Sequence, residues 1–377
     1  MGFARMTQQR VIFDAGPVAG GTEFAAPLRL IRAESPADVP RALAEMEAAR
    51  AEGLWLAGYA SYELGYCLAA DRLGPLMPAG RATPLLLFGA FEGPRPAQPA
   101  AATSARLSTP EPEMDFPRYR ELFARAHDYI GAGDIYQVNL TFPMRTHTDA
   151  APAELYAALA ARQPVGHGAL VELGGPAVLS RSPELFFSVS GGTITTRPMK
   201  GTVARGATPA EDARLRAWLA ASEKDRAENL MIVDLLRNDI ARVAEAGSVM
   251  VPELFHVESY ETVHQMVSEV EGRLVPGTGL GNIFAALFPC GSVTGAPKVR
   301  AMEIIAELEQ TPRDVYCGAI GWAAPDGRAS FNVAIRTLVM QEDGELRLNV
   351  GGGVVWDSTD EAEYSEALWK ARFAILD

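Results

Sequence analysis

Residues 168–198 read GALVELGGPAVLSRSPELFFSVSGGTITTRP. This stretch predicts four short strands in quick succession, at 168–173, 177–182, 184–190 and 193–198. Further strands are predicted downstream, at 248–257, 262–272, 315–322, 330–340 and 346–355. Helical patterns are found at 115–133, 151–164, 222–244, 280–288, 298–309 and 358–376. Runs of consecutive strands broken by single helices favour an α+β fold with antiparallel sheets and helices packed on the outer faces.

The chain has 377 residues, enough for two or three average domains or for one large domain with a sizeable core. Residues 1–92 carry several strand patterns and one helical pattern at 37–53. Residues 93–114 are rich in proline and alanine and poor in bulky apolar residues, which indicates an exposed connection. Residues 115–377 contain the remaining elements, so we expect the catalytic region there.

The formal net charge is −13, which argues against broad binding to nucleic acid or to an anionic membrane surface. No apolar run is long enough to span a bilayer, and no secretory leader is evident. Cys67, Cys290 and Cys317 are far apart and form no metal or disulfide pattern. We therefore expect a cytoplasmic protein, and an anionic small ligand would require a few local cations or a metal.

Two helical patterns carry carboxylates that share a face. Asp225 and Glu228 are three residues apart in one, and Glu363, Glu366 and Lys370 follow the same spacing in the other. Each pair alone is also typical of a solvated helix surface. If the two pairs face each other across a cleft, their oxygen atoms would suit a hard cation such as Mg²⁺.

Three basic or flexible features lack an obvious structural role. Arg336 lies within the predicted strand 330–340, where it either reaches water from an edge strand or binds a ligand carboxylate. Gly351–Gly353 interrupt another strand, which indicates either a bulge or a close approach of the backbone to a ligand. Lys200, in RPMKGT, follows a strand and is expected in a turn. A lysine in a turn is usually a solvated charge.

A series of long motifs, in order along 115–377, resembles the chorismate-utilising enzymes. The motifs are GDIYQVNLT, SRSPELFF, RPMKGTVARG, EKDRAENLMIVDLLRND, ETVHQMVSEVEG, GSVTGAPKVRAMEII, YCGAIGW, FNVAIRT and GGGVVWDSTDEAEYSEALWKA. The resemblance implies two large antiparallel sheets packed face to face between outer helical layers. It also implies that chorismate binds with Mg²⁺ in a cleft.

The resemblance implies a role for each candidate residue. Glu228 and Glu366 would contact Mg²⁺ directly, with Asp225 and Glu363 acting through water, although glutamate is more usual at position 225. The remaining substrate contacts implied are Lys370, Gly351, Gly352 and Gly353 at the ring carboxylate, Arg336 and Tyr316 at the enolpyruvyl carboxylate, and Thr294 and His264 near the C4 hydroxyl, with Gln137 and Thr202 also lining the site.

Lys200 and Gln137 distinguish the branches of this family. The motif around Lys200 resembles the branch that places nitrogen on C4 of chorismate. Gln137 stands where the branches that add water to C2 carry a lysine, so it argues against isochorismate and salicylate chemistry. On this reading the neutral Lys200 amine adds at C2 as the C4 hydroxyl leaves, and Glu184 protonates that hydroxyl. The apolar residues after Glu184 are expected to raise its pKa.

The resemblance also implies an ammonia source. No cysteine lies in a glycine-rich elbow with a downstream histidine, so we expect a separate glutamine amidotransferase subunit. The expected product is 4-amino-4-deoxychorismate, for p-aminobenzoate and folate. Two alternatives stay open: anthranilate synthesis from chorismate, and a non-catalytic chorismate-binding protein. The usual tryptophan-feedback motif is absent, so no inhibition by tryptophan is expected.

Overall fold

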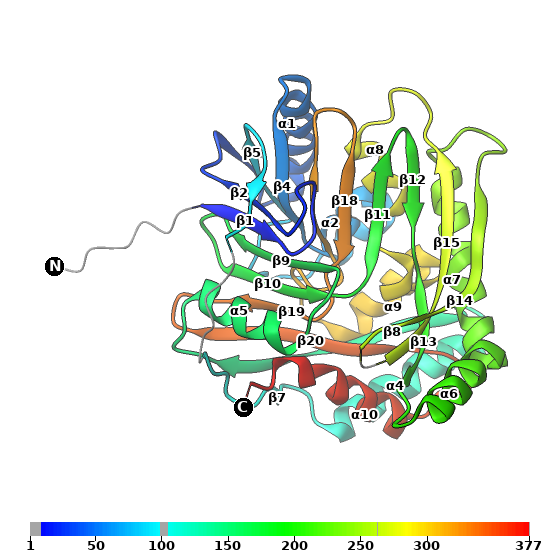
Figure 1. The fold of residues 1–377 in the computed structure, drawn as a ribbon. Helices are drawn as coiled ribbons and strands as arrows, with labels where there is room; N and C mark the ends of the chain where they lie inside the picture. Colours follow the sequence, from blue (N-terminus) through cyan, green and yellow to red (C-terminus); the bar gives the residue numbers. More distant parts are fainter. Residues whose placement is uncertain (1–8, 99–104, 262, 377) are drawn as a thin grey trace.

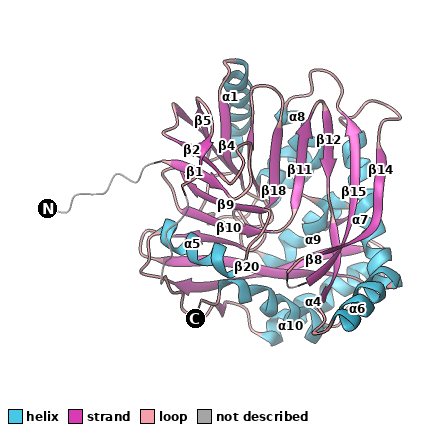
Figure 2. Ribbon diagram, viewed as in Figure 1, coloured by secondary structure: helices cyan, strands magenta, loops and turns pink. Residues whose placement is uncertain are grey.

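The computed structural model describes residues 9–98, 105–261 and 263–376. They form two ten-stranded antiparallel sheets. In Figure 1 the strands of the first sheet run across the view and those of the second run up and down, so the sheets cross at a large angle. The expected α+β class with two large sheets and outer helices is confirmed (Figure 2).

The first sheet draws on both ends of the chain. Its strands, in spatial order, are β16 (Gly295–Ala296), β8 (Gln137–His147), β20 (Glu345–Val354), β19 (Thr337–Met340), β10 (Ala177–Ser182), β9 (His167–Glu172), β1 (Arg10–Phe13), β2 (Thr22–Ala25) and β6 (Arg95–Pro96), with β7 (Glu111–Pro112) beside β8.

The second sheet likewise mixes early and late strands. Its order is β13 (Met199–Ala204), β15 (Val263–Arg273), β12 (Thr193–Thr196), β11 (Leu185–Ser190), β18 (Ala329–Val333), β17 (Ala319–Ala323), β4 (Trp55–Ala60), β5 (Leu86–Phe91) and β3 (Arg29–Ala33), with β14 (Met250–Ser259) beside β15. The strands of residues 9–92 therefore enter both sheets, and short strands form at each end of the proline-rich segment.

Helices cover the outer faces. Those packed on strands of the first sheet are α4 (Phe116–Gly131), α5 (Pro152–Arg162), α9 (Lys298–Glu309) and α10 (Asp360–Lys370). Those packed on strands of the second are α1 (Val39–Ala51), α6 (Pro209–Ala221) and α7 (Glu223–Ala241), with α8 (Leu280–Leu287) against α1 and α7. The short helices are α2 (Leu64–Leu68), α3 (Ala70–Leu73), η1 (Pro36–Asp38), η2 (Gly74–Leu76), η3 (Gly291–Val293) and η4 (Ala371–Ala374).

Aromatic and β-branched side chains fill the space between the sheets. Phe24 of β2 packs against Phe91 of β5 at a ring distance of 5.5 Å, and Tyr59 and Trp322 lie in the same buried cluster. A larger cluster joins the sheets to the helices. Burial of this apolar surface is the main source of stability.

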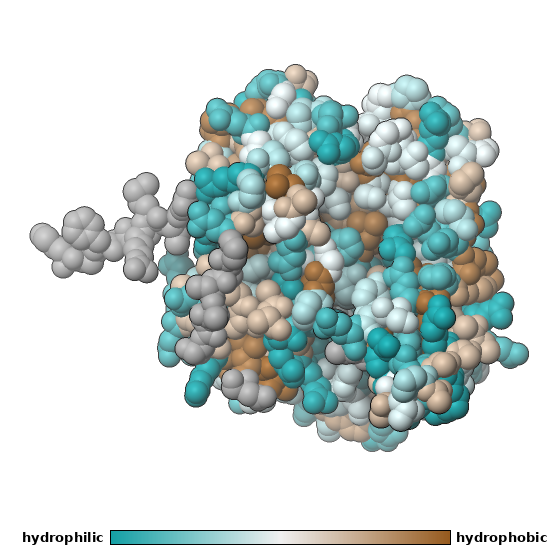
Figure 3. Space-filling view, viewed as in Figure 1, coloured by the Kyte–Doolittle hydropathy of each residue, from teal (hydrophilic) through white to brown (hydrophobic). Residues whose placement is uncertain are grey.

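Local signals in the sequence explain where the helices that carry site residues begin. Ser222 caps α7, because its hydroxyl accepts a hydrogen bond from the Asp225 backbone N–H. Asp115 caps α4 in the same way by accepting from the Arg118 N–H. In the described part of the chain, no helix combines the length and the apolar character needed to cross a bilayer. Hydrophilic residues cover most of the face seen in Figure 3.

Candidate active site

The three consecutive glycines of β20 provide space rather than a bulge. Gly351, Gly352 and Gly353 pair in unbroken register with residues of β8. A β-carbon on Gly352 would lie only 2.6 Å from Oε2 of Glu363. The lack of side chains therefore lets functional groups approach the strand backbone, which is one of the two interpretations that the sequence left open.

Lys200 lies at this glycine strand. A β-carbon on Gly353 would be 3.2 Å from the Lys200 Nζ and 3.0 Å from the amide of Gln137. The sequence predicted a turn at Lys200, but the lysine lies in β13, where the pairing with β15 shifts register between Met199 and Thr202. This irregularity sends a side chain of the second sheet toward the first.

Glu184 is the buried acid of the site. Glu184 directly precedes β11 and is only 6% exposed. Burial raises the pKa of Glu184 to about 7, against the opposing effects of a hydrogen bond from Ser292 and the charge of Lys200. The direction is the one expected from its apolar flank. Near neutral pH this carboxyl can therefore give or take a proton.

The charge of Lys200 acts on two carboxylates of α10, and a carboxylate of α7 lies beside the glycine that follows it. Asp225 of α7 is so close to Gly201 that a β-carbon there would meet it at 2.8 Å. On α10, burial followed by the charge of Glu366 raises the pKa of Glu363. Burial also tends to raise the pKa of Glu366, but its ion pair with Lys370 at 2.9 Å and the charge of Lys200 hold that pKa below its ordinary value.

The four carboxylates offer few ligands to any one ion. Across residues 9–98, 105–261 and 263–376, no three His, Cys, Asp or Glu side chains are grouped closely enough to hold a metal. Glu228 is also near Lys224, at 4.0 Å. On α10 the Glu363 carboxylate nevertheless lies beside Gly352 and Glu366 is one turn away, and Mg²⁺ is usually held by one or two carboxylates, waters and an anionic substrate. The donor set fits such an ion.

Two cations border the same strand. The Lys370 Nζ donates to the Gly351 carbonyl at 2.9 Å. Arg336 adopts a left-handed backbone, with φ of 50°, and its carbonyl accepts from the Arg181 N–H. Burial lowers the pKa of Arg336, and within the described ranges no carboxylate pairs with its guanidinium. Such a strained, half-buried and unpaired cation indicates an anion site.

The predicted strand 330–340 is wrong in one respect. It divides into β18 of the second sheet and β19 of the first, and Arg336 lies in the connection between them. Arg336 is therefore neither an edge-strand residue nor part of a regular inward and outward alternation. Arg336 therefore lies where the chain passes from the second sheet to the first.

The remaining predicted substrate contacts differ in whether their polar atoms already have partners. They are Gln137, Thr294, Tyr316 and Thr202. Gln137 is wholly buried, yet neither amide atom has a hydrogen-bond partner among the described residues. The Thr294 hydroxyl donates to the Cys290 carbonyl at 3.0 Å, and Tyr316 is buried. Thr202 donates to the Gln265 side chain at 2.7 Å. Gln137 thus has an unused amide facing the site, whereas the hydroxyls of Thr202 and Thr294 are already occupied.

His264 does not join this group. Its Nε2 lies 3.0 Å from Asp212 of α6 and its Nδ1 lies 2.8 Å from the Ser259 hydroxyl, so both ring nitrogens are used on the helical side of β15. The next residue, Gln265, faces the other way and donates to the Gly201 carbonyl at 2.9 Å. Strand alternation predicts that His264 and Gln265 lie on opposite faces of β15, but it does not indicate which face borders the site.

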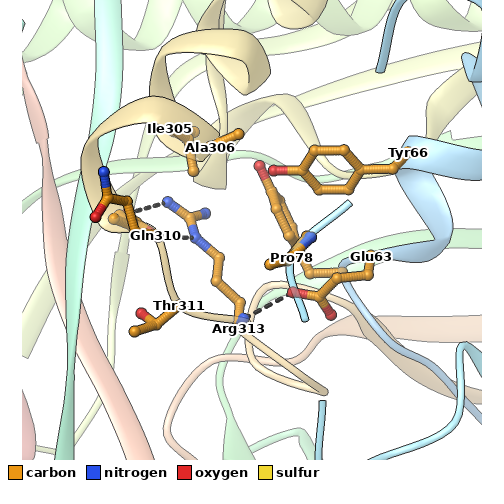
Figure 4. A pocket seen from close by; sticks show the side chains of 10 residues that line it. Glu63, Tyr66, Pro78, Ile305, Ala306, Gln310, Thr311 and Arg313 are labelled. Atoms are coloured by element: carbon orange, nitrogen blue, oxygen red, sulfur yellow. Dashed lines mark hydrogen bonds and ion pairs between the residues drawn. The ribbon is translucent and has the colours of Figure 1, made fainter. Parts of the chain in front are cut away.

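Arg313 is a buried residue that sequence reasoning missed. It is 2% exposed, pairs with Glu309 at 2.7 Å, and donates to the carbonyls of Asn139 and Val293 at 2.7 and 3.0 Å. It thereby joins β8 to η3, next to Gln137 and Ser292. Figure 4 shows Arg313 beside a small pocket, with Glu63 opposite.

The fold is shared with solved structures that cover nearly the whole chain. Anthranilate synthase component I from Streptococcus pneumoniae TIGR4 superposes with a TM-score of 0.80 at 24% identity, covering 99% of this chain and 93% of that one. The menaquinone-specific isochorismate synthase MenF from Escherichia coli gives a TM-score of 0.74 at 20% identity, covering 98% and 88%. At these identities the likeness concerns the fold.

The chain belongs to the chorismate binding enzyme family, which matches residues 16–376. It is 47% identical over 274 residues to aminodeoxychorismate synthase component 1 of Klebsiella aerogenes, covering 72% of this chain and 60% of that protein. It is 43% identical over 275 residues to an anthranilate synthase component 1 of Haloarcula marismortui, covering 73% and 54%. A Streptomyces pristinaespiralis aminodeoxychorismate synthase is matched at 47% over 36% of its length. The matched region thus spans about a third to three-fifths of these relatives.

Proposed function

We propose that this chain is component I of an aminodeoxychorismate synthase, which converts chorismate and ammonia into 4-amino-4-deoxychorismate for p-aminobenzoate and folate synthesis. The observation that carries the proposal is the position of the Lys200 amine, 3.2 Å from where a β-carbon of Gly353 would be. Glu184, whose carboxyl senses the charge of Lys200, supplies the acid.

The proposed chemistry has two displacements. The neutral Lys200 amine forms a bond to C2 while the ring double bonds shift and the C4–O bond breaks, and Glu184 gives its proton so that water leaves. Ammonia then bonds to C4, the double bonds shift back, and the C2–N bond breaks to release Lys200. Glu184, left as a carboxylate by the first step, takes the proton that the adduct nitrogen loses and returns it to that nitrogen as the C2–N bond breaks. The new nitrogen on C4 keeps its three protons as an ammonium group, and the next ammonium ion that enters reprotonates Glu184 as it becomes ammonia.

Binding of the substrate uses the cations and glycines of the site. Chorismate is a dianion, so the unpaired Arg336 is proposed to bind the enolpyruvyl carboxylate, and Lys370 and the Gly351–Gly353 backbone to lie at the ring carboxylate. Glu228 and Glu366 would hold Mg²⁺, with Asp225 and Glu363 nearby. When bound, the ion would supply positive charge against the ring carboxylate. Gln137 fits as a neutral contact to the ring substituents.

The ammonia is proposed to come from a separate glutamine amidotransferase subunit. The component 1 designation of the Klebsiella relative supports a two-component enzyme. Anthranilate synthesis is the second candidate, because relatives from Haloarcula marismortui and Streptomyces coelicolor, at 43% and 44% identity, carry that designation. The Lys200 amine at the glycine strand supports the first candidate, since direct addition of ammonia at C2 requires no enzyme amine.

Product identification separates the two candidates. Purified protein is incubated with chorismate, an ammonium salt and Mg²⁺, and the products are followed by mass spectrometry and fluorescence. The proposal expects 4-amino-4-deoxychorismate, which becomes p-aminobenzoate only when the matching lyase is added. Fluorescent anthranilate formed without the lyase would reject it. The same assay without Mg²⁺ tests whether the activity depends on the metal.

A further inference from the structure

Three buried side chains, two from the η3 turn and its cap and one that precedes β11, form a line that ends at Glu184. The Ser292 hydroxyl donates to Oε1 of Glu184 at 2.7 Å, and the Cys290 Sγ lies 3.2 Å from the same hydroxyl oxygen. All three side chains are buried, at 4% exposure for Cys290 and 8% for Ser292. Neither residue has a role in the function proposed above.

We infer that Cys290 and Ser292 are positioning residues, which together form a directed hydrogen-bond chain that orients Glu184 and leaves its Oε2 atom for the substrate. This inference rests on the proposed function for its catalytic meaning. The chain itself is a property of the resting protein.

The direction of the chain follows from the protons available. Burial raises the pKa of the Cys290 thiol to about 12, so the thiol keeps its proton at working pH. The single proton of the Ser292 hydroxyl is used on Glu184, which leaves its oxygen as an acceptor. The thiol therefore donates to Ser292 and Ser292 donates to Glu184.

Both ends of the chain are anchored. On one side, the Thr294 hydroxyl donates to the carbonyls of Cys290 and Gly291, at 3.0 and 3.3 Å, and fixes the η3 turn. On the other, the Glu184 backbone N–H donates to Ser182, whose hydroxyl donates to the Val333 carbonyl at 2.6 Å. A rotation of the Glu184 carboxyl would therefore break a buried hydrogen bond without replacement.

The orientation has a consequence for proton transfer. Because Oε1 accepts from Ser292, the proton of the neutral carboxyl lies on Oε2. Within the described residues no hydrogen bond is made to Oε2, so it is the atom free to meet the leaving hydroxyl. Lys200 is the charged group that acts on this carboxyl, and the other groups near it among the described residues are the Ser292 hydroxyl and the thiols of Cys290 and Cys317, both of which keep their protons.

Variants of the chain can be ranked in advance. Ser292→Ala removes the donor to Glu184, so we expect kcat to fall by about tenfold or more while the KM for chorismate changes by less than about twofold. The pH at which kcat declines should rise by about one unit, because a bond that favoured the carboxylate is lost.

Cys290→Ala should have a smaller effect on kcat than Ser292→Ala. Cys290→Ser keeps a donor and should behave like the parent. Cys67→Ala is the matched control, because this half-buried cysteine takes no part in the hydrogen-bond chain.

An infrared measurement tests the chain without catalysis. The full-length protein is titrated with pH. The carbonyl stretch of the protonated Glu184 carboxyl is isolated by subtracting the spectrum of Glu184→Gln. In Ser292→Ala the band should move to higher frequency, because its carbonyl loses a donor. An unchanged band in Ser292→Ala would overturn the inference. So would equal damage from Cys290→Ser and Cys290→Ala, a comparison that also serves if Ser292→Ala does not fold. If the protein makes another product, the proposed function is wrong, but the infrared result still shows whether the hydrogen-bond chain to Glu184 exists.

Discussion

The Nζ of Lys200 lies 3.2 Å from the point that a β-carbon on Gly353 would occupy, although the two residues belong to different sheets. The glycine strand and the lysine therefore share one small space. A methyl group at position 353 would compete for it with the Lys200 amine and with the Gln137 amide.

Gly353→Ala is accordingly expected to harm catalysis more than stability. The new methyl group would press on the flexible ends of Lys200 and Gln137, which can move by a few tenths of an ångström. We expect kcat/KM to fall by roughly 10- to 100-fold, because the amine loses its alignment, with little change in the melting temperature. Steady-state kinetics and thermal unfolding measure the two effects. Gly175→Ala is the control, since a β-carbon there has no neighbour within 4 Å. Equal kinetics for the two variants would contradict this account.

Gln137→Leu should separate stability from binding. The Gln137 amide is buried without a protein partner, so an apolar side chain of similar size should leave the free energy of unfolding unchanged or raise it by about 1–2 kcal/mol. The KM for chorismate should rise about tenfold if the amide binds the substrate. Urea unfolding and kinetics give the two numbers, and Gln341→Leu, on a hairpin away from the site, provides the comparison. A less stable variant with parental KM would show that Gln137 has a structural role instead.

Glu63 predicts a pH dependence of stability. Burial, followed by the charge of Asp314, raises the pKa of Glu63 from 4.5 to about 8. A carboxyl whose folded pKa is raised contributes stability that is fully present below pH 4.5 and is lost as the pH rises through about 8. Between these limits the parent should lose on the order of 3–5 kcal/mol relative to Glu63→Gln. Urea unfolding of both proteins at pH 5 and pH 9 measures the difference. Identical differences at the two pH values would show that Glu63 is not desolvated as the structure indicates.

Local patterns predicted those elements that local interactions determine. The helix at 115–133 was predicted, and α4 begins at Phe116 after its cap, Asp115. The helix at 222–244 was likewise predicted, and α7 begins after its cap, Ser222. The convergence of Lys200, the glycine strand and the carboxylates of α10 was expected only through the resemblance to a family, since no local signal brings residues so far apart together.

Other features depend on tertiary context and were not predicted. Helix α6 has a cap at Thr208 and a proline in its first turn, but its weak amphipathic pattern gave no signal. Residues 330–340, SFNVAIRTLVM, contain no glycine or proline, so the change from one sheet to the other at 334–336 looked like a single strand. The hydrogen bond between Glu184 and Ser292 joins residues that are 108 positions apart, and periodicity along the chain carries no information about such a contact.

The central claim is that the Lys200 amine forms a bond to the substrate ring. The most direct measurement is a single-turnover assay of Lys200→Ala and Lys200→Arg with chorismate, ammonia and Mg²⁺, combined with chorismate binding by equilibrium dialysis. The account predicts binding within about threefold of the parent and a loss of turnover of roughly a thousandfold or more in both variants. Turnover at the parental rate in Lys200→Ala would contradict it.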